Sequence, residues 1–303
     1  MKKTSPLSQY QGAFFIILAG SAFAGVNAFT PYVASTFSLN ASWIALYQYF
    51  FALIVMLPWL LKSGIGKHVK TDFFWRHFWR VILAVIGVHF WIKALTVPIP
   101  IGQGLSLLMI SPLFVCLGAV FYLGETISTK RSLALITGFI GALIILNPWS
   151  DSFSYVMFFP LIAAFFWACH TVMLKNITGK DSALTIVFYL YILTLPFNFI
   201  LAITDNLTQF STFMWIKPNN TGLWYLFLLG ALTALGQWSL AKAYSAADAT
   251  YIQPFDYFKL PINVLLGYIF FGWGIDGLFL IGASLIILAT LYLTFGDKPK
   301  LLK

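Results

Sequence analysis

The chain has 303 residues, of which 60% are apolar, 18% are aromatic and 9% are charged, and its net charge is +9. A soluble domain carries about 25% charged residues, so this composition excludes a soluble enzyme or binding domain and indicates a membrane protein with several spans. The basic residues lie in short segments between apolar runs, which argues against nucleic-acid binding.

Ten apolar segments follow one another along the chain. A helix needs about 20 mostly apolar residues to cross a bilayer, and the fifth segment is short by this measure. The sequence therefore predicts an all-α membrane protein with ten transmembrane helices. The predicted segments are 11–32, 43–61, 74–95, 102–123, 132–146, 155–174, 184–203, 223–244, 250–271 and 275–295.

Most Lys and Arg residues fall in alternate loops and in the short tails, 1–10 and 297–303. The exceptions are Lys93 and Lys217, which would lie in the non-cytoplasmic loops, and Lys259, which would lie within the membrane. Cytoplasmic loops of membrane proteins are enriched in Lys and Arg. We therefore expect a multi-pass protein of the bacterial inner membrane with both termini in the cytoplasm. The lipid bilayer is an expected partner, and both monomer and homodimer remain open.

The chain repeats itself when it is shifted by 149 residues. This shift places Lys93-Ala94 on Lys242-Ala243 and Pro112 on Pro261. The repeat divides the chain into halves at 11–147 and 154–296, each with five predicted helices. Because five is odd, the second half would enter the membrane upside down. Inverted repeats of this kind are typical of secondary transporters.

The ninth segment carries the strongest candidate for a site. Asp256, Lys259 and Asn263 have the spacing i, i+3 and i+7, so on one continuous helix they form a polar stripe. A charge at membrane depth costs about 2.5–3.5 kcal/mol, so it usually faces a cavity or a partner. Two interpretations of the pair are open: a structural ion pair, or a clamp in which Asp256 meets an amino group and Lys259 a carboxylate.

Further candidates surround this stripe. Gln253 lies beside it, and Pro254 and Pro261 predict a bend because proline interrupts the backbone hydrogen bonds of a helix. The aromatic residues next to polar positions would stack on a purine or flavin ring, or bind a sulfonium by a cation–π contact. These aromatic candidates are Trp91, Tyr251, Phe255 and Tyr257, and the remaining polar candidates are Asn27, Gln103 and His170. For His170, a hydrogen bond between helices is the alternative.

Several motifs carry a resemblance to a known family. The fourth and fifth segments read Pro112-x5-Gly118, Leu123-Gly124-Glu125 and then Gly138-x2-GALIIL, and the ninth reads ADATYIQPFDYFKLP followed by LLGYIFFG. Over essentially the whole chain this resembles the drug/metabolite transporter superfamily in its ten-helix form with two EamA-type halves. The segment KAYSAADAT-x3-PFDYFKLP looks most like bacterial S-adenosylmethionine uptake carriers, and riboflavin and amino-acid carriers have similar ninth helices.

The chain departs from the family pattern at one place. Gly124-Glu125 of the first half aligns with Trp273-Gly274 of the second at the shift of 149 residues, so the second carboxylate is absent. We expect Glu125 to cap the N-terminus of the fifth helix.

We predict a secondary transporter that moves a small metabolite by alternating access. The sequence has no phosphate-binding glycine loop, HExxH or GxSxG motif, so neither catalytic residues nor a metal or cofactor site is predicted, and the chain is expected not to be an enzyme. The resemblance favours S-adenosylmethionine, exchanged for S-adenosylhomocysteine, as substrate. The alternatives are an exporter of amino acids or amino-acid-derived metallophores and a riboflavin carrier; a lipid scramblase or a membrane enzyme is less favoured.

Overall fold

The computed structural model describes residues 6–96, 107–146, 158–210, 218–272 and 277–296, and within these ranges the regular elements are all helices. The predicted all-α class is confirmed, and each predicted segment corresponds to a helix or, for the ninth, to two. The helices are α1 (Pro6–Phe37), α2 (Ala41–Ser63), α3 (Ile65–Val69), α4 (Phe74–Thr96), α6 (Ser111–Leu123), α7 (Thr129–Leu146), α8 (Phe158–Ile177), α9 (Ala183–Phe210), α10 (Asn220–Ala246), α11 (Ala249–Asp256), α12 (Lys259–Phe271) and α13 (Gly277–Gly296).

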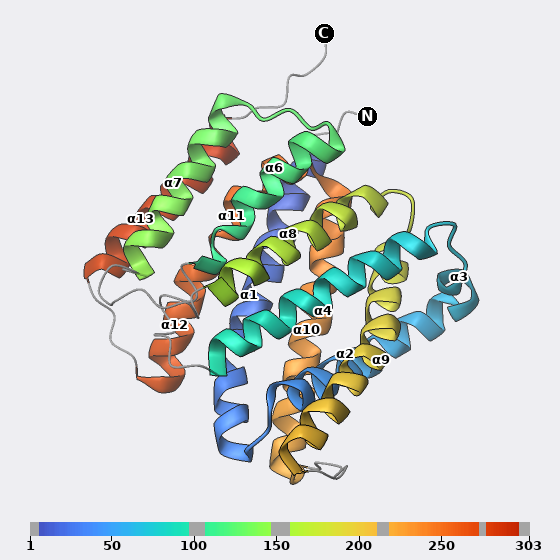
Figure 1. Cartoon of the computed structure of the whole chain (residues 1–303). Helices are drawn as coiled ribbons and strands as arrows, with labels where there is room; N and C mark the ends of the chain where they lie inside the picture. Colours follow the sequence, from blue (N-terminus) through green and yellow to red (C-terminus); the bar gives the residue numbers. More distant parts are fainter. Residues whose placement is uncertain (1–5, 97–106, 147–157, 211–217, 273–276, 297–303) are drawn as a thin grey trace.

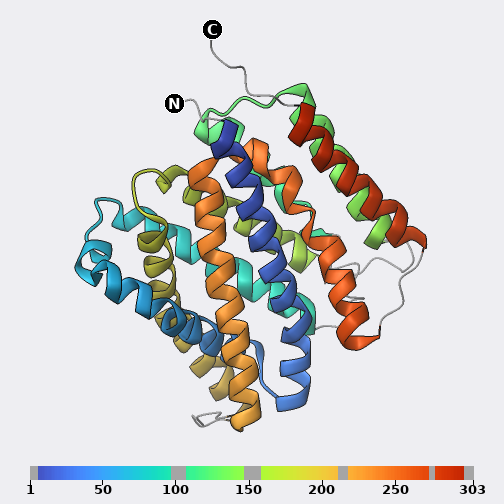
Figure 2. The same ribbon diagram turned by 180° about the vertical axis from the view of Figure 1, so that it is seen from behind.

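Most of the long helices form a closed ring. Each contacts the next in the order α1, α10, α2, α9, α4, α8, α6 and α11, and α11 returns to α1. The pair α7 and α13 packs outside the ring beside α11 and α12 (Figure 1). The start of α1 and the end of α13 lie at the same end of the bundle, which we call the N-terminal end (Figure 2).

Length and composition support membrane crossing. Five helices, namely α1, α2, α8, α9 and α10, are long and apolar enough to span a bilayer, and α6 and α13 contain shorter apolar runs. Two of the long helices begin at asparagine caps, because the side chain of Asn40 accepts a hydrogen bond from Trp43 N and that of Asn219 from Gly222 N. These caps satisfy backbone donors that would otherwise be left unpaired.

The two halves repeat each other in structure at a shift of 148 residues. Helices α6 and α12 each have 13 residues, and each ends at a left-handed glycine, Gly124 with φ 68° and Gly272 with φ 67°. Glycine adopts this conformation without a steric penalty. The register differs by one residue from the 149 derived from the sequence. The counterpart of Gly124-Glu125 is therefore Gly272-Trp273, so the second half keeps the glycine and lacks the carboxylate.

The ninth predicted span is interrupted. Helix α11 ends at Asp256 and α12 begins at Lys259, between the two prolines. The intervening turn has i to i+3 hydrogen bonds, from Phe258 N to Phe255 O at 3.1 Å and from Leu260 N to Tyr257 O at 3.0 Å. The predicted bend is thus present as a break between two helices. A similar turn precedes α6, where Ile110 N donates to Leu107 O.

Helices α7 and α13 touch backbone to backbone. A Cβ atom added at Gly282 would lie 2.4 Å from the carbonyl oxygen of Gly141, and one added at Gly141 would lie 2.7 Å from that of Gly282. Small residues permit this approach between membrane helices. The contact leaves no room for a side chain at either of these two glycines.

We expect Gly282→Ala to lower the apparent melting temperature of the purified protein, because α7 and α13 must move apart. Overpacking costs about 1–3 kcal/mol, which corresponds to a fall of roughly 3–10 °C in a chain of this size. Gly277→Ala on the same helix is the matched control, because a Cβ atom there meets nothing within 4 Å. Equal melting temperatures for the two variants would contradict this account of the packing.

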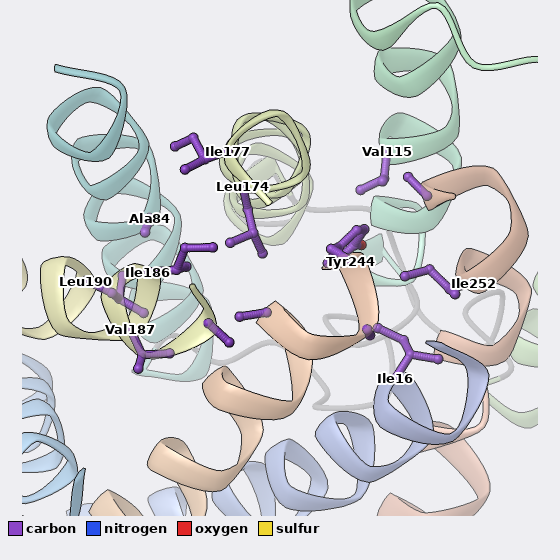
Figure 3. Close-up of a cluster of buried hydrophobic side chains, with 14 of the residues drawn as sticks. Ile16, Ala84, Val115, Leu174, Ile177, Ile186, Val187, Leu190, Tyr244 and Ile252 are labelled. Carbon is purple, nitrogen blue, oxygen red and sulfur yellow. The ribbon is translucent and has the colours of Figure 1, made fainter. Parts of the chain in front are cut away.

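A buried apolar cluster lies toward the N-terminal end of the ring. Figure 3 shows its side chains converging from several helices, including Ile16 of α1, Val115 of α6, Leu174 of α8, Tyr244 of α10 and Ile252 of α11. Each of these five side chains is at most 2% exposed. Burial of apolar surface stabilises this end of the bundle, and the cluster forms one boundary of the central cavity.

Candidate functional site

A cavity of about 200 Å³ lies inside the helix ring. Its walls come from α1, α2, α4, α6, α8, α10, α11 and α12, so both halves of the chain contribute. Ile16, Val115 and Tyr244 belong both to its lining and to the apolar cluster, which bounds it on the N-terminal side. Its polar and aromatic lining residues are Phe23, Asn27, Thr30, Gln48, Tyr49, Trp91, Ser111, Trp167, His170, Thr171, Thr233, Gln237, Tyr244, Gln253, Asp256 and Lys259.

Asp256 and Lys259 form an ion pair at the cavity wall. Lys259 Nζ lies 2.6 Å from Asp256 Oδ2, and the two side chains are 18% and 17% exposed. The pair bridges the break in the ninth span, since Asp256 ends α11 and Lys259 begins α12. Each charge is therefore largely compensated by the other.

The helix dipoles oppose both charges of this pair. The C-terminus of a helix carries partial negative charge and its N-terminus partial positive charge. Asp256 lies at a C-terminus and Lys259 at an N-terminus, so each has the unfavourable sign for its position. A pair placed for helix stability alone would have its two signs exchanged.

Several other predicted residues also reach the cavity. Asn27, Trp91, His170 and Gln253 line it together with the ion pair. Gln253 donates a hydrogen bond to the hydroxyl of Tyr244, and His170 Nδ1 lies 2.9 Å from the backbone carbonyl of Arg80. His170 thus combines the two alternatives considered for it, since it joins α8 to α4 and also faces the cavity.

The remaining predicted residues lie elsewhere. Tyr251 and Tyr257 are buried, with the Tyr251 ring 5.5 Å from the guanidinium of Arg131 and the Tyr257 ring packed on Gly138. Phe255 packs against Tyr251 with ring centroids 5.5 Å apart. Asn263 donates to the backbone carbonyl of Lys259 at 2.9 Å. None of these four side chains is part of the described cavity lining, and Gln103 lies outside the described residues.

Sequence reasoning missed part of the lining. Gln237 is an isolated amide in an apolar span. The same feature marks Asn27, so Gln237 was also identifiable from the sequence. Gln48 donates to Thr233 Oγ1 at 2.6 Å, which joins α2 to α10. Trp167 lies three residues before His170 on α8, and its ring centroid is 6.4 Å from that of Trp91. Only the packing of α4 against α8 brings these two tryptophans together.

Glu125 closes the N-terminal end by capping a helix of the other half. Its carboxylate accepts hydrogen bonds from Ala249 N at 3.0 Å, Thr250 N at 2.9 Å and Thr250 Oγ1 at 3.0 Å. The prediction that it caps the fifth helix is wrong, because these donors belong to the first turn of α11. A carboxylate at a helix N-terminus is favourable both as a hydrogen-bond acceptor and by charge.

Two cations strengthen the same closure. Arg131 Nη1 donates to Thr250 Oγ1 at 3.0 Å and lies 3.5 Å from Asp248 Oδ2. Lys175 Nζ donates to the carbonyl oxygens of Tyr244, at 2.9 Å, and Ala247. Helices α7 and α8 are thereby joined to the connection between α10 and α11. These contacts and the apolar cluster separate the cavity from the N-terminal end.

A ring of membrane-spanning helices from two repeated halves, around a partly polar cavity with a partly buried ion pair in its wall, defines a small-molecule carrier. The model of the EamA-like transporter family matches residues 11–147 and again residues 154–295, and the chain belongs to this family. Its relatives are transporters and not enzymes, as the sequence predicted.

Individual relatives transport different compounds. The chain is 45% identical over 291 residues to a riboflavin transporter from Vibrio cholerae. The aligned region covers 96% of this chain and 95% of the relative. It is 30% identical to an S-adenosylmethionine uptake transporter from Rickettsia felis, and this alignment covers 86% of this chain and 85% of the relative. A crystal structure with 15% identity superposes with a TM-score of 0.76 over 95% of this chain and 96% of that one, which supports the fold.

Proposed function

We propose that the protein carries riboflavin across the bacterial inner membrane by alternating access. The transporter class follows from the family, and riboflavin is our choice among its substrates. This choice replaces S-adenosylmethionine, which the sequence motifs had favoured. The higher identity to a riboflavin transporter, 45% against 30%, supports the change, and the chemistry of the cavity supports it independently.

The observation that carries the proposal is the electrostatic balance of the cavity wall. Among the described lining residues, Asp256 and Lys259 are the pair with opposite formal charges, and they bind each other at 2.6 Å. A cationic sulfonium compound would need a carboxylate free to pair with it, because an unpaired charge is costly away from water. A neutral substrate has no such requirement.

The rest of the lining suits a neutral aromatic compound with many hydrogen-bonding groups. Asn27, Gln48, Gln237 and Gln253 supply amides, each of which offers both donors and an acceptor. Such groups match the alternating donors and acceptors of a flavin ring edge and the hydroxyls of its side chain. Trp91 and Trp167 add flat apolar surface, on which a tricyclic ring can stack.

The cavity volume bears on the transport cycle. Pockets that enclose drug-sized ligands usually have about 300–1,000 Å³, and this one has about 200 Å³. Riboflavin binding would therefore widen the cavity, which is consistent with a carrier that changes shape around its substrate. We infer that 11–147 and 154–296 act as the two moving halves and that both termini are cytoplasmic. The lysine distribution supports this orientation.

Counterflow in proteoliposomes tests the proposal. Vesicles loaded with unlabelled riboflavin should transiently accumulate labelled riboflavin, and external S-adenosylmethionine in tenfold excess should not compete. In a second set, vesicles loaded with S-adenosylhomocysteine should not accumulate labelled S-adenosylmethionine. Accumulation in the second set alone would replace riboflavin by S-adenosylmethionine, and the ion pair would then be the clamp for its amino-acid portion.

We expect Trp91→Leu to raise the half-saturating riboflavin concentration about tenfold, since stacking on an aromatic side chain is worth about 1–3 kcal/mol per base. Trp75→Leu is the control, because Trp75 is 68% exposed on the outer surface of α4. Initial uptake rates at several riboflavin concentrations measure the effect. A half-saturating concentration unchanged by Trp91→Leu would remove Trp91 from the proposed site.

A further inference from the structure

A second hollow lies on the outside of the ring. It has a volume of about 520 Å³ and lies between α2, the start of α9 and α10. None of its lining residues also lines the central cavity. We call it the α2–α10 groove. It is lined by Val55, Met56, Trp59, His68, Ser182, Ala183, Leu184, Ala231, Ala234, Leu235, Trp238 and Lys242.

The groove faces the lipid side of the bundle. Helices α2, α9 and α10 are all long and apolar enough to cross a membrane, and α2 diverges from α10 toward the N-terminal end (Figure 2). Trp59 and Leu235 at the groove are 57% and 41% exposed on this outer surface. An apolar hollow in this position fits an acyl chain better than a water-soluble ligand.

One end of the groove carries a cation. Lys242 is exposed, and its Nζ lies 5.7 Å from the centroid of the Trp238 ring. No acidic partner of Lys242 occurs among the described residues. The sequences of α2, α3 and α10 contain no Asp or Glu, so these helices supply no carboxylate for Lys242. Helices α2 and α3 add two further cations, Lys62 and Lys67.

The other polar groups at the groove are already paired. His68 Nε2 lies 2.7 Å from Ser63 Oγ and its Nδ1 lies 3.0 Å from Thr185 Oγ1. Asp181, next to Ser182, receives hydrogen bonds from Thr71 and His77 instead of pairing with Lys242. The charge that the groove presents to a ligand is therefore the ammonium of Lys242.

We propose that the α2–α10 groove binds one anionic phospholipid. An acyl chain lies along the apolar walls, and the headgroup phosphate pairs with Lys242 beside Trp238. Basic residues and tryptophan at the ends of membrane helices attract anionic headgroups in this way. The groove is thus a lipid site that helps to hold α2 against α10, separate from the transport cavity.

Native mass spectrometry of the purified full chain tests the proposal, with phosphatidylglycerol and phosphatidylcholine of identical acyl chains as probes. We expect the unmodified protein to retain one phosphatidylglycerol at least tenfold more often than one phosphatidylcholine, and Lys242→Gln to lose this preference. Lys70→Gln is the matched control, because Lys70 is exposed beyond α3 and outside the groove lining. Ala231→Phe, which fills the groove, should reduce retention of both lipids.

The alternatives give distinct results. Equal retention of both lipids by the unmodified protein, or an unchanged preference in Lys242→Gln, would overturn the proposal. A loss in Lys70→Gln as large as that in Lys242→Gln would also overturn it, because it would indicate diffuse attraction to a basic surface. Riboflavin uptake by Lys242→Gln provides a check on folding, since the variant leaves the central cavity unaltered.

Discussion

Asp256→Asn is expected to lower riboflavin uptake by about two orders of magnitude. Removing one partner of a fully buried ion pair costs about 3–5 kcal/mol, because the other charge is left uncompensated. This pair is 17–18% exposed, so we take the lower figure of about 3 kcal/mol, and each 1.4 kcal/mol is a factor of ten. Here the stranded charge is Lys259, which lies at the start of α12, where the helix dipole already disfavours a cation. Initial uptake into proteoliposomes measures the loss.

A double variant separates a structural role of the pair from a role in transport. Asp256→Asn combined with Lys259→Met removes both charges, so no unpaired charge remains at the break between α11 and α12. If the pair serves only to hold α11 and α12 together, this variant should regain both the melting temperature and the uptake of the unmodified protein. We expect the melting temperature to recover and the uptake to stay low. Asp72→Asn, at an exposed position before α4, is the control for loss of a carboxylate.

Glu125→Ala is expected to open the N-terminal end of the bundle. The change removes the Glu125 carboxylate, whose residue is 4% exposed. The backbone N–H groups of Ala249 and Thr250 then lose their hydrogen-bond acceptor. Hydrogen bonds to a charged group contribute about 1.5–3 kcal/mol each. We therefore expect the melting temperature to fall by about 5 °C or more.

Cys116 provides a native reporter of this opening. It is 3% exposed on α6 and lies nine residues before Glu125, and α6 packs against α11. The experiment uses a Cys169→Ser background and measures the rate at which Cys116 reacts with a thiol reagent. This rate should rise at least tenfold in Glu125→Ala, because lowering the free energy of local opening by about 1.4 kcal/mol gives that factor. Thr250→Val, which removes one of the three donors, should give a smaller increase. An unchanged rate in Glu125→Ala would show that the cap does not keep this end closed.

The fold was predictable because a bilayer imposes a minimum length on each apolar run, and loop lysines mark the places between them. The ion pair was predictable for a related reason, since charged residues within an apolar span are costly. The same reasoning points to Asn27 and His170, and both lie at the cavity wall. These inferences depend on composition along the chain and not on the rotation of any helix.

The orientation of the side chains around the ion pair was not predictable in this way. The polar stripe from Asp256 to Asn263 assumes one continuous helix, and the break after α11 changes the direction of the positions that follow. The prediction of Tyr251 and Tyr257 as site residues depends on their polar neighbours in the sequence. Their directions depend instead on Arg131 and Gly138, which belong to the other half of the chain. Glu125 was misassigned for the same reason, because its donors lie 124 and 125 residues away.

Under the proposed alternating access, the single carboxylate at Glu125 would make the two orientations of the carrier energetically unequal. In a perfectly symmetric inverted repeat, both ends would close through the same contacts and the two conformations would have equal free energy. Here Glu125 caps α11 at one end, while the corresponding position of the other half is Trp273. The substrate-free protein would thus favour the conformation closed at the N-terminal end even without a gradient. Such a resting bias presents the empty site mainly to one compartment, and so favours loading from that side.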